Sequence, residues 1–186
     1  MAEDFLGDIP VLTGIPQLPE AKHFAECEQQ MGLRFPPSYI QFVNRFGYGR
    51  LCELFLVYVP LGGEFDSLEL RWAEIGETIR ESLEADLVEF PPDGSVDLVR
   101  GLCPFGVSEN GHTVAWDPSS HAEDGELDIY MMGNKMLSVT RVGRSMREFV
   151  RAVSSADVKR VLGIGYEPLP ICFRPLGSSG RRTAGT

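Results

Sequence analysis

The chain has 186 residues, of which 43% are hydrophobic and 10% aromatic. This length fits one domain, and the composition excludes global disorder because the chain can bury a sizeable core. The longest apolar run, residues 54–59, is far shorter than the ~18 residues of a membrane-spanning helix. The acidic N-terminus lacks a signal-peptide pattern, and the four cysteines are scattered without a CxxC motif. We therefore expect a soluble cytoplasmic protein with buried thiols and no membrane contact.

The net charge is −10 and it is unevenly distributed. Residues 1–140 carry 24 acidic and 8 basic side chains, whereas residues 141–186 carry 3 acidic and 9 basic ones. An acidic body repels nucleic acid and attracts basic partners. The arginines at 141, 144, 147 and 151 are interpreted as one solvated helix face beside that body. We therefore predict no binding of nucleic acid.

The N-terminal third predicts a surface segment followed by two helices. Residues 1–19 are punctuated by proline and glycine, which is typical of irregular chain at the surface. Apolar residues at helical spacing predict a helix over 19–31, ended by Gly32. The pair Pro36-Pro37 predicts the start of a second helix, because proline is tolerated in the first turn, and Gly47 predicts its end.

The next segment predicts a buried strand and one long helix. Residues 51–59 are apolar, aromatic or β-branched up to Pro60, which favours a single strand. Ser67 can cap a helix that runs to about Leu87, and the break at 91–94 follows. One apolar stripe repeats along this helix at intervals of three and four residues: Leu68, Trp72, Ile75, Ile79, Leu83 and Leu87.

Two β-hairpins are predicted after residue 100. The first joins 102–107 to 113–116 through Asn110-Gly111, a strong hairpin signal because these residues readily adopt positive φ. The second joins 127–132 to 136–142 through a turn at residues 133–134.

The chain is predicted to close with a helix over 145–153. Ser145 and Glu148 form a capping-box pattern there, and 155–162 predicts one or two further helical turns. This order of elements predicts an α+β fold with a mainly antiparallel sheet. We expect a surface segment at 1–19, one domain at 20–162 and a C-terminal extension at 163–186, with a flexible tail from 177.

The stretch GLCPFGVSENGHTVAWD, residues 101–117, invites three chemical interpretations. A phosphate loop is disfavoured, because the stretch lacks a GxGxxG or GxxxxGK pattern and no helix follows it. Cysteine catalysis would pair Cys103 with His112 or His121, but an apolar run raises the pKa of a thiol and makes it inert. A metal site could use His112, Asp117, His121 and Asp124, or His23 with Cys27, yet no compact ligand motif is present. We therefore predict no enzyme activity, no metal and no cofactor.

Two acidic groups are the candidate partner-binding residues. On the predicted long helix, glutamates recur at three and four residues on the face opposite Trp72, Ile75 and Ile79. Like charges at this spacing cost about 0.2–0.5 kcal/mol per pair, so a purely structural helix would interleave lysines. Solubility is the alternative explanation. The two candidate groups are Glu74, Glu77, Glu81 and Glu84, and Glu123, Asp124, Glu126 and Asp128.

Three segments together resemble the SUKH superfamily. They are AKHFAECEQQMGLRFPPSYIQFVNRFGYGRL at 21–51, the 101–117 stretch, and SMREFVRAV at 145–153. The resemblance covers roughly residues 20–153. It departs from the commonest pattern in Cys103 before Pro104 and in the long 163–186 extension. The superfamily is dominated by bacterial immunity proteins and includes a yeast cell-wall regulator.

The resemblance implies binding without chemistry. Members of the superfamily are typically encoded beside polymorphic toxins, often nucleases or deaminases, and neutralise them by direct contact. It carries over no catalytic set and implies structural roles for Gly106, Asn110, Gly111, Trp116 and Asp117. We thus predict an immunity protein whose acidic side chains dock on the basic cleft of a cognate toxin. The alternative is a regulatory scaffold or adaptor that binds a cellular partner.

Overall fold

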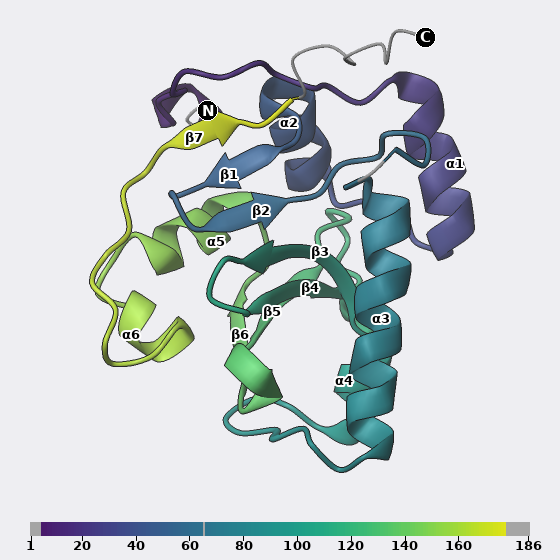
Figure 1. Ribbon diagram of the computed structural model, residues 1–186, viewed down its shortest axis with the longest axis vertical. Helices are drawn as coiled ribbons and strands as arrows, with labels where there is room; N and C mark the ends of the chain where they lie inside the picture. The colour runs from purple at the N-terminus through teal and green to yellow at the C-terminus, as the bar shows by residue number, and fades with distance from the viewer. Residues whose placement is uncertain (1–4, 65, 178–186) are drawn as a thin grey trace, which may run out of the picture.

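The computed structural model describes residues 5–64 and 66–177, and Figure 1 shows how their helices and strands are arranged. The elements, with η marking 3₁₀ helices, are η1 Phe5–Asp8, α1 Ala21–Met31, α2 Pro37–Phe46, β1 Gly49–Leu51, β2 Phe55–Val57, α3 Leu68–Glu84, α4 Val96–Gly101, β3 Cys103–Ser108, β4 Thr113–Asp117, η2 Pro118–Ser120, β5 Asp128–Met132, η3 Asn134–Met136, β6 Val139–Gly143, α5 Met146–Val153, α6 Val158–Val161 and β7 Phe173–Pro175. The described strands form one sheet in the order β6-β5-β4-β3-β2-β1-β7, with antiparallel neighbours throughout. The α+β fold with a mainly antiparallel sheet is therefore confirmed.

The sheet separates a large core from a small one. Successive side chains of a strand point to opposite faces, so Val114 and Trp116 enter the large core while Ala115 enters the small one. Helices α1, α2 and α5 cover the large core, whereas α4 and the C-terminal half of α3 cover the small one. The ring of Trp116 stacks on Phe105 at 4.1 Å between centroids and meets Tyr39 edge-on at 4.8 Å. This cluster anchors the large core.

The single strand predicted over 51–59 is wrong. The structure has two short strands, β1 and β2, which pair antiparallel and place Leu51 opposite Phe55. Cys52 and Glu53 turn the chain between them with φ of 53° and 55°, and Leu54 N–H donates to the carbonyl of Leu51 at 3.1 Å. Neither Cys nor Glu is a usual residue for positive φ, so the sequence pattern carries no turn signal at this point.

The long helix α3 is present, but it ends three residues earlier than predicted. Its last residue is Glu84, and Asp86 then takes φ 56°, which turns the chain away from the helix axis. Leu87, which was expected on the buried stripe, is 63% exposed for this reason. The remaining stripe is buried or half-buried, from Leu68 at the start to Leu83 near the end.

Between α3 and β3 the chain forms a helix that was not predicted. Ser95 caps α4 by accepting the N–H of Leu98 at 3.2 Å, a usual start for a helix. The second predicted hairpin also has a longer connection than expected. Its strands β5 and β6 are joined by residues 133–138, where Lys135 and Met136 both have positive φ.

The two ends of the described chain are bound to each other at the edge of the sheet. Strand β7 pairs with β1, and the N-terminal segment lies along β7, where Leu12 N–H donates to Phe173 O at 2.7 Å. The N-terminal and C-terminal segments therefore lie side by side at the top of Figure 1. The side chain of Phe173 is fully buried.

Residues 163–186 were predicted to extend beyond the domain. Residues 173–175 instead form the edge strand of the sheet, and the ring of Phe173 packs against Phe42 and Phe46. The tail predicted beyond 177 lies outside the described residues. In the part of the chain that the structure describes, no helix has the length and hydropathy needed to cross a membrane.

Candidate protein-binding surface

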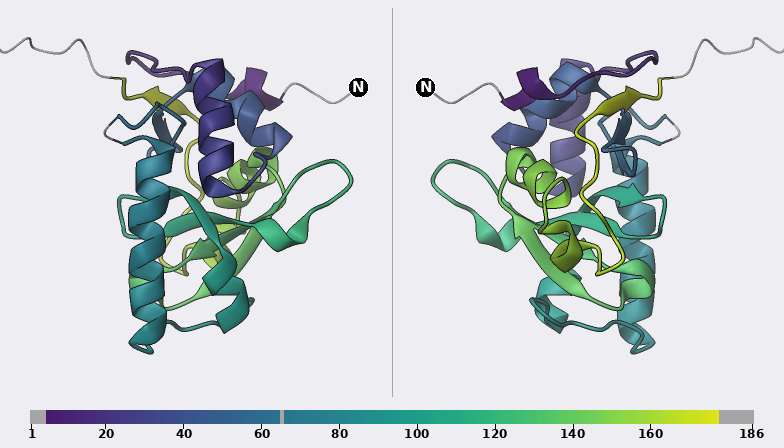
Figure 2. Two further views of the ribbon diagram at one scale, coloured as in Figure 1. Left: turned by 90° about the vertical axis from the view of Figure 1, so that its right-hand side faces the viewer. Right: turned by 90° about the vertical axis from the view of Figure 1, so that its left-hand side faces the viewer.

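Helix α3 presents four exposed glutamates, Glu74, Glu77, Glu81 and Glu84, which we call the α3 acidic face. The helix runs along one side of the molecule, from its start beside α1 to its end beside α4 (Figures 1 and 2). Two of the four side chains are in ion pairs within the helix. Glu74 contacts Arg71 at 2.7 Å, and Glu77 contacts Arg80. The charge in the first half of the face is thus partly neutralised.

The last turn of α3 concentrates negative charge that no described residue pairs. Glu81 and Glu84 have no ion-pair partner among the described residues, and the last turn holds no basic side chain. A helix C-terminus carries partial negative charge, so a nearby carboxylate is disfavoured by about 0.3–1 kcal/mol. Asp86, also exposed, adds a third carboxylate just beyond the helix. This arrangement lowers the stability of the free protein and would be relieved by a cationic partner.

A groove with two hollows lies beside this acidic end, between α3 and α4, and we call it the α3–α4 groove. One hollow has a volume of about 410 Å³ and reaches from Trp72 to Leu102 and Cys103. The other, about 230 Å³, lies between the end of α3 and residues 86–90. Arg80 and Arg100 line both hollows, so the two are adjacent.

The floor of the groove contains glycines that the fold does not require. A Cβ atom at Gly76 or Gly101 would meet no atom within 4 Å. Gly76 has no positive φ and lies in the middle of a 17-residue helix, where glycine costs about 0.8–1.0 kcal/mol relative to alanine. The glycine at 76 therefore keeps the groove open at a cost in helix stability.

The second acidic group, on the loop after β4 and the start of β5, is largely engaged within the protein. Glu126 accepts hydrogen bonds from Ser38 N–H at 2.9 Å and Ser38 Oγ at 2.8 Å, and it thereby caps α2. Burial raises its pKa. Asp128 forms a bidentate pair with Arg141 at 2.7 Å, and Asp124 contacts Arg144 at 3.2 Å.

Of this group, Glu123 alone is exposed and has no ion-pair partner among the described residues. Residues 118–127 project from the side of the molecule away from α3 (Figure 2). The structure therefore keeps the two acidic groups apart. The basic C-terminal portion, expected to be a solvated helix face, instead supplies Arg141 and Arg144 to this loop.

The 101–117 stretch forms the end of α4 and the β3–β4 hairpin. Gly106 lies where a Cβ would come within 2.8 Å of Leu56 O on the neighbouring strand. Gly111 takes φ 84° in the loop 109–112, and the Asn110 side chain donates to Tyr166 Oη at 2.8 Å. Asp117 accepts from Ser119 N–H at 2.9 Å and thereby starts η2. With Trp116 in the core, all five residues have contacts within the fold.

The thiol and imidazole groups of this stretch do not converge. Cys103 is the first residue of β3, whereas His112 lies at the opposite end of the hairpin, next to the turn. Burial raises the pKa of the Cys103 thiol, which disfavours the thiolate that catalysis requires. The His112 imidazole Nδ1 lies 2.8 Å from Ser108 Oγ, and burial lowers its pKa. His121 is exposed beyond η2.

No group of three or more metal-ligating side chains is found within residues 5–64 and 66–177. The carboxylates considered as ligands have other contacts, since Asp117 caps η2 and Asp124 contacts Arg144. On α1, the imidazole of His23 lies against Gly62, while Cys27 Sγ is 3.6 Å from the sulfur of Met31.

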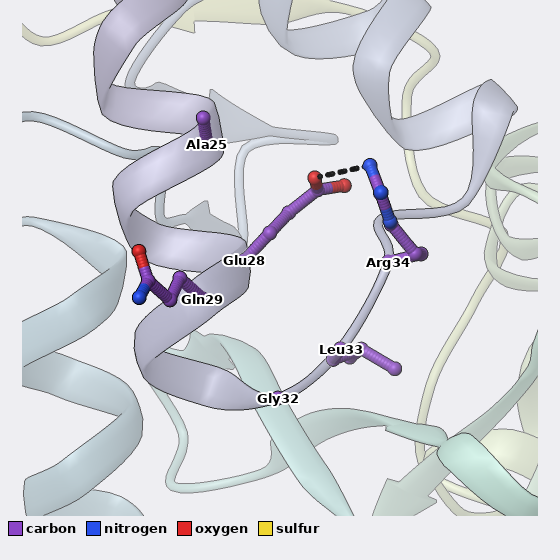
Figure 3. A pocket seen from close by; sticks show the side chains of 6 residues that line it. All are labelled: Ala25, Glu28, Gln29, Gly32, Leu33 and Arg34. Atoms are coloured by element: carbon purple, nitrogen blue, oxygen red, sulfur yellow. Dashed lines mark hydrogen bonds and ion pairs between the residues drawn. The ribbon is translucent and has the colours of Figure 1, made fainter.

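A further hollow of about 320 Å³ lies at the C-terminal end of α1 (Figure 3). It forms where Gly32, with φ 63°, ends the helix and the chain turns toward α2. Its central carboxylate, Glu28, accepts from Phe35 N–H at 2.8 Å and Arg34 Nη1 at 3.3 Å. Its charge is therefore used to hold the turn.

Comparison with known proteins identifies the family. The model of the SMI1 / KNR4 family (SUKH-1) matches residues 19–152. The chain belongs to the SMI1/KNR4 family. This family includes toxin-immunity proteins and a yeast regulator, which bind protein partners. Among curated proteins, no match to the chain was found.

The matched range includes α3, α4 and the groove between them. It excludes the N-terminal segment and β7, which pair with each other at the sheet edge. The N-terminal segment and β7 therefore extend the matched region at one edge of the sheet, while α6, also outside the match, packs against α5 and β6.

Proposed function

We propose that this SUKH-1 protein is an immunity protein that binds a cognate toxin, a nuclease or deaminase with a basic cleft, and neutralises it by direct contact. The observation that carries the proposal is the pair of exposed glutamates at the end of α3 that have no ion-pair partner among the described residues. Glu81 and Glu84 repel each other and the helix dipole, so they reduce the stability of the free protein. A cationic surface placed against them would remove both penalties.

Electrostatics also accounts for how such a protein would act. Clustered charge steers an oppositely charged partner and raises the association rate. A nuclease must hold phosphate in a cationic cleft, so an acidic helix seated there would occupy the substrate's position. The proposed site of action is the cytoplasm, and binding requires no cofactor. The buried Cys103 and the distant His112 favour binding without turnover.

The α3 acidic face is preferred to the loop after β4 as the docking surface. Glu126 and Asp128 are already used to hold α2 and β6, whereas Glu81 and Glu84 are exposed and unpaired within the described chain. Glu123 and Asp124 remain the candidate contacts on the loop. The two surfaces lie on different sides of the molecule and can be tested separately.

Co-expression tests the proposal. The product of the gene next to this chain's own gene is induced with and without the chain, and growth is followed. We expect growth to be restored and a stable complex to elute from gel filtration. Absence of both would contradict the immunity function. Capture of several housekeeping proteins without a toxin would favour the regulatory-scaffold alternative that the yeast family member represents.

A further inference from the structure

The α3–α4 groove combines three features that suit a side chain from another protein. Its two adjacent hollows, about 410 Å³ and 230 Å³, lie along α3. Pockets that hold ligands have volumes from about 300 Å³, so the larger hollow can take one large apolar side chain. The floor at Gly76 and Gly101 is open to close approach, since a Cβ at either position meets no atom within 4 Å.

The groove is lined by apolar as well as charged residues, and some of the apolar ones are exposed. Ile79 and Val99 are buried beneath it, while Val96 on α4 is 43% exposed. Leu87, between two residues that line the smaller hollow, is 63% exposed because α3 ends before it. These two exposed apolar side chains lie beside the smaller hollow, where an apolar side chain of a partner would contact them.

The charge around the groove specifies the chemistry of the occupant. Its two arginines are already neutralised, Arg80 by Glu77 and Arg100 by Asp97 at 3.3 Å. Glu84 and Asp86, which line the smaller hollow, have no ion-pair partner among the described residues, and Glu81 is on the adjoining turn. The rim therefore presents net negative charge to whatever enters.

We infer that the α3–α4 groove binds a basic amphipathic helix of the partner, with its apolar side chains in the two hollows and its lysines or arginines against Glu81, Glu84 and Asp86. The inference rests on the proposed function and names the element of the toxin that this surface recognises. A groove between two helices with an apolar floor and a charged rim is the usual receptor for such a helix. The groove supplies shape and apolar contact, and the carboxylates supply orientation.

Two synthetic peptides test the groove without the toxin. Both are 18-residue helices with lysines on one face, and the other face carries leucines in the first and alanines in the second. Alanine favours helix at least as strongly as leucine, so the control does not lose binding through lower helicity. Fluorescence anisotropy of the labelled peptides at about 0.15 M salt gives the dissociation constants. We expect the full-length protein to bind the leucine peptide at least about tenfold more tightly than the alanine peptide.

The variant Gly76→Leu locates the contact. Its side chain enters open space, so the fold is retained, while the larger hollow is filled. We expect the preference for the leucine peptide to disappear in Gly76→Leu, with the affinity for the alanine peptide unchanged. The double variant Glu81→Lys/Glu84→Lys should bind both peptides more weakly and still prefer the leucine peptide.

Equal affinity of the two peptides for the natural chain would overturn the inference, and so would a preference that survives Gly76→Leu. Either result is distinct from failure of the proposed function, which is measured by growth on co-expression. Restored growth without a leucine preference refutes the groove alone. If the protein prefers the leucine peptide, Gly76→Leu abolishes that preference, and growth is not restored, the groove binds a helix but the proposed immunity function is refuted.

Discussion

Gly76→Ala is a direct test of the geometry described for α3. The residue lies in the middle of a 17-residue helix, where alanine is favoured over glycine by about 0.8–1.0 kcal/mol. The new methyl group meets no atom within 4 Å, so no packing penalty offsets this gain. We therefore expect the free energy of unfolding to rise by about 1 kcal/mol and the melting temperature by about 2–4 °C for a chain of this size.

Urea unfolding followed by far-UV circular dichroism measures this change, with Gly106→Ala as the matched control. At Gly106 the same methyl group would lie 2.8 Å from Leu56 O on the adjacent strand, so it requires a shift of the sheet and should destabilise by about 1–3 kcal/mol. Opposite signs at the two positions are the expected result. A loss of stability in Gly76→Ala would show that the groove floor is filled and would refute the argument that the glycine is retained for binding.

Three further predictions concern stability and are checked by urea unfolding. Burial lowers the pKa of His112 from its usual value near 6.5, so the unfolded state binds the proton more readily than the folded state. The free energy of unfolding of the natural chain should therefore fall as the pH is lowered from about 7 to about 5.5. The His112→Gln variant should lose less stability over this range, and an equal loss would contradict this prediction. Glu126→Ala leaves Ser38 N–H without its acceptor and should cost about 0.5–2 kcal/mol, whereas no loss would show that α2 does not need this cap. Phe173→Ala should lower the free energy of unfolding by about 3–5 kcal/mol, because the side chain is fully buried. The control Ile171→Ala changes a side chain that is 45% exposed and should lower it far less. Equally small losses in both variants would mean that β7 is not part of the core.

The fold was predictable where local pattern and tertiary packing agree. The helix α2 begins at Pro37 and ends before Gly47, as proline and glycine predict. Gly111 turns the β3–β4 hairpin as expected, and Ser145 caps α5 by accepting the N–H of Glu148 at 3.2 Å. The capping box is nevertheless altered, because the Glu148 carboxylate accepts from Arg144 N–H instead of from Ser145 N–H.

The missed elements depend on contacts between distant residues. Strand β7 is three residues long and follows a proline-rich segment, so only its pairing with β1 and the burial of Phe173 identify it as a strand. The turn at Cys52 and Glu53 is similar, because pairing of β1 with β2 imposes positive φ on residues that rarely adopt it. Local sequence propensity predicts neither the strand nor the turn.

The candidate site shows the same division. The spacing of the glutamates predicted a shared exposed face on α3, and these residues do lie on the surface of the helix. The groove was not predicted, because it requires α4, which the sequence pattern did not reveal. Gly76 was a possible signal, since a glycine inside an otherwise strong helical pattern often has a packing or functional reason. Which acids are neutralised, such as Asp128 by Arg141, depends on the pairing of β5 with β6.

The central claim, that the acidic end of α3 docks on a cationic protein, is tested most directly by association kinetics. Stopped-flow association with the product of the neighbouring gene is measured from about 0.05 to 0.3 M salt for two double variants of equal charge change. Glu81→Lys/Glu84→Lys should associate at least about tenfold more slowly at low salt and lose most of its salt dependence. The control Asp8→Lys/Glu26→Lys changes two exposed residues outside both candidate surfaces and should change the rate much less. Equal slowing in both variants, or no slowing in the α3 variant, would contradict the account.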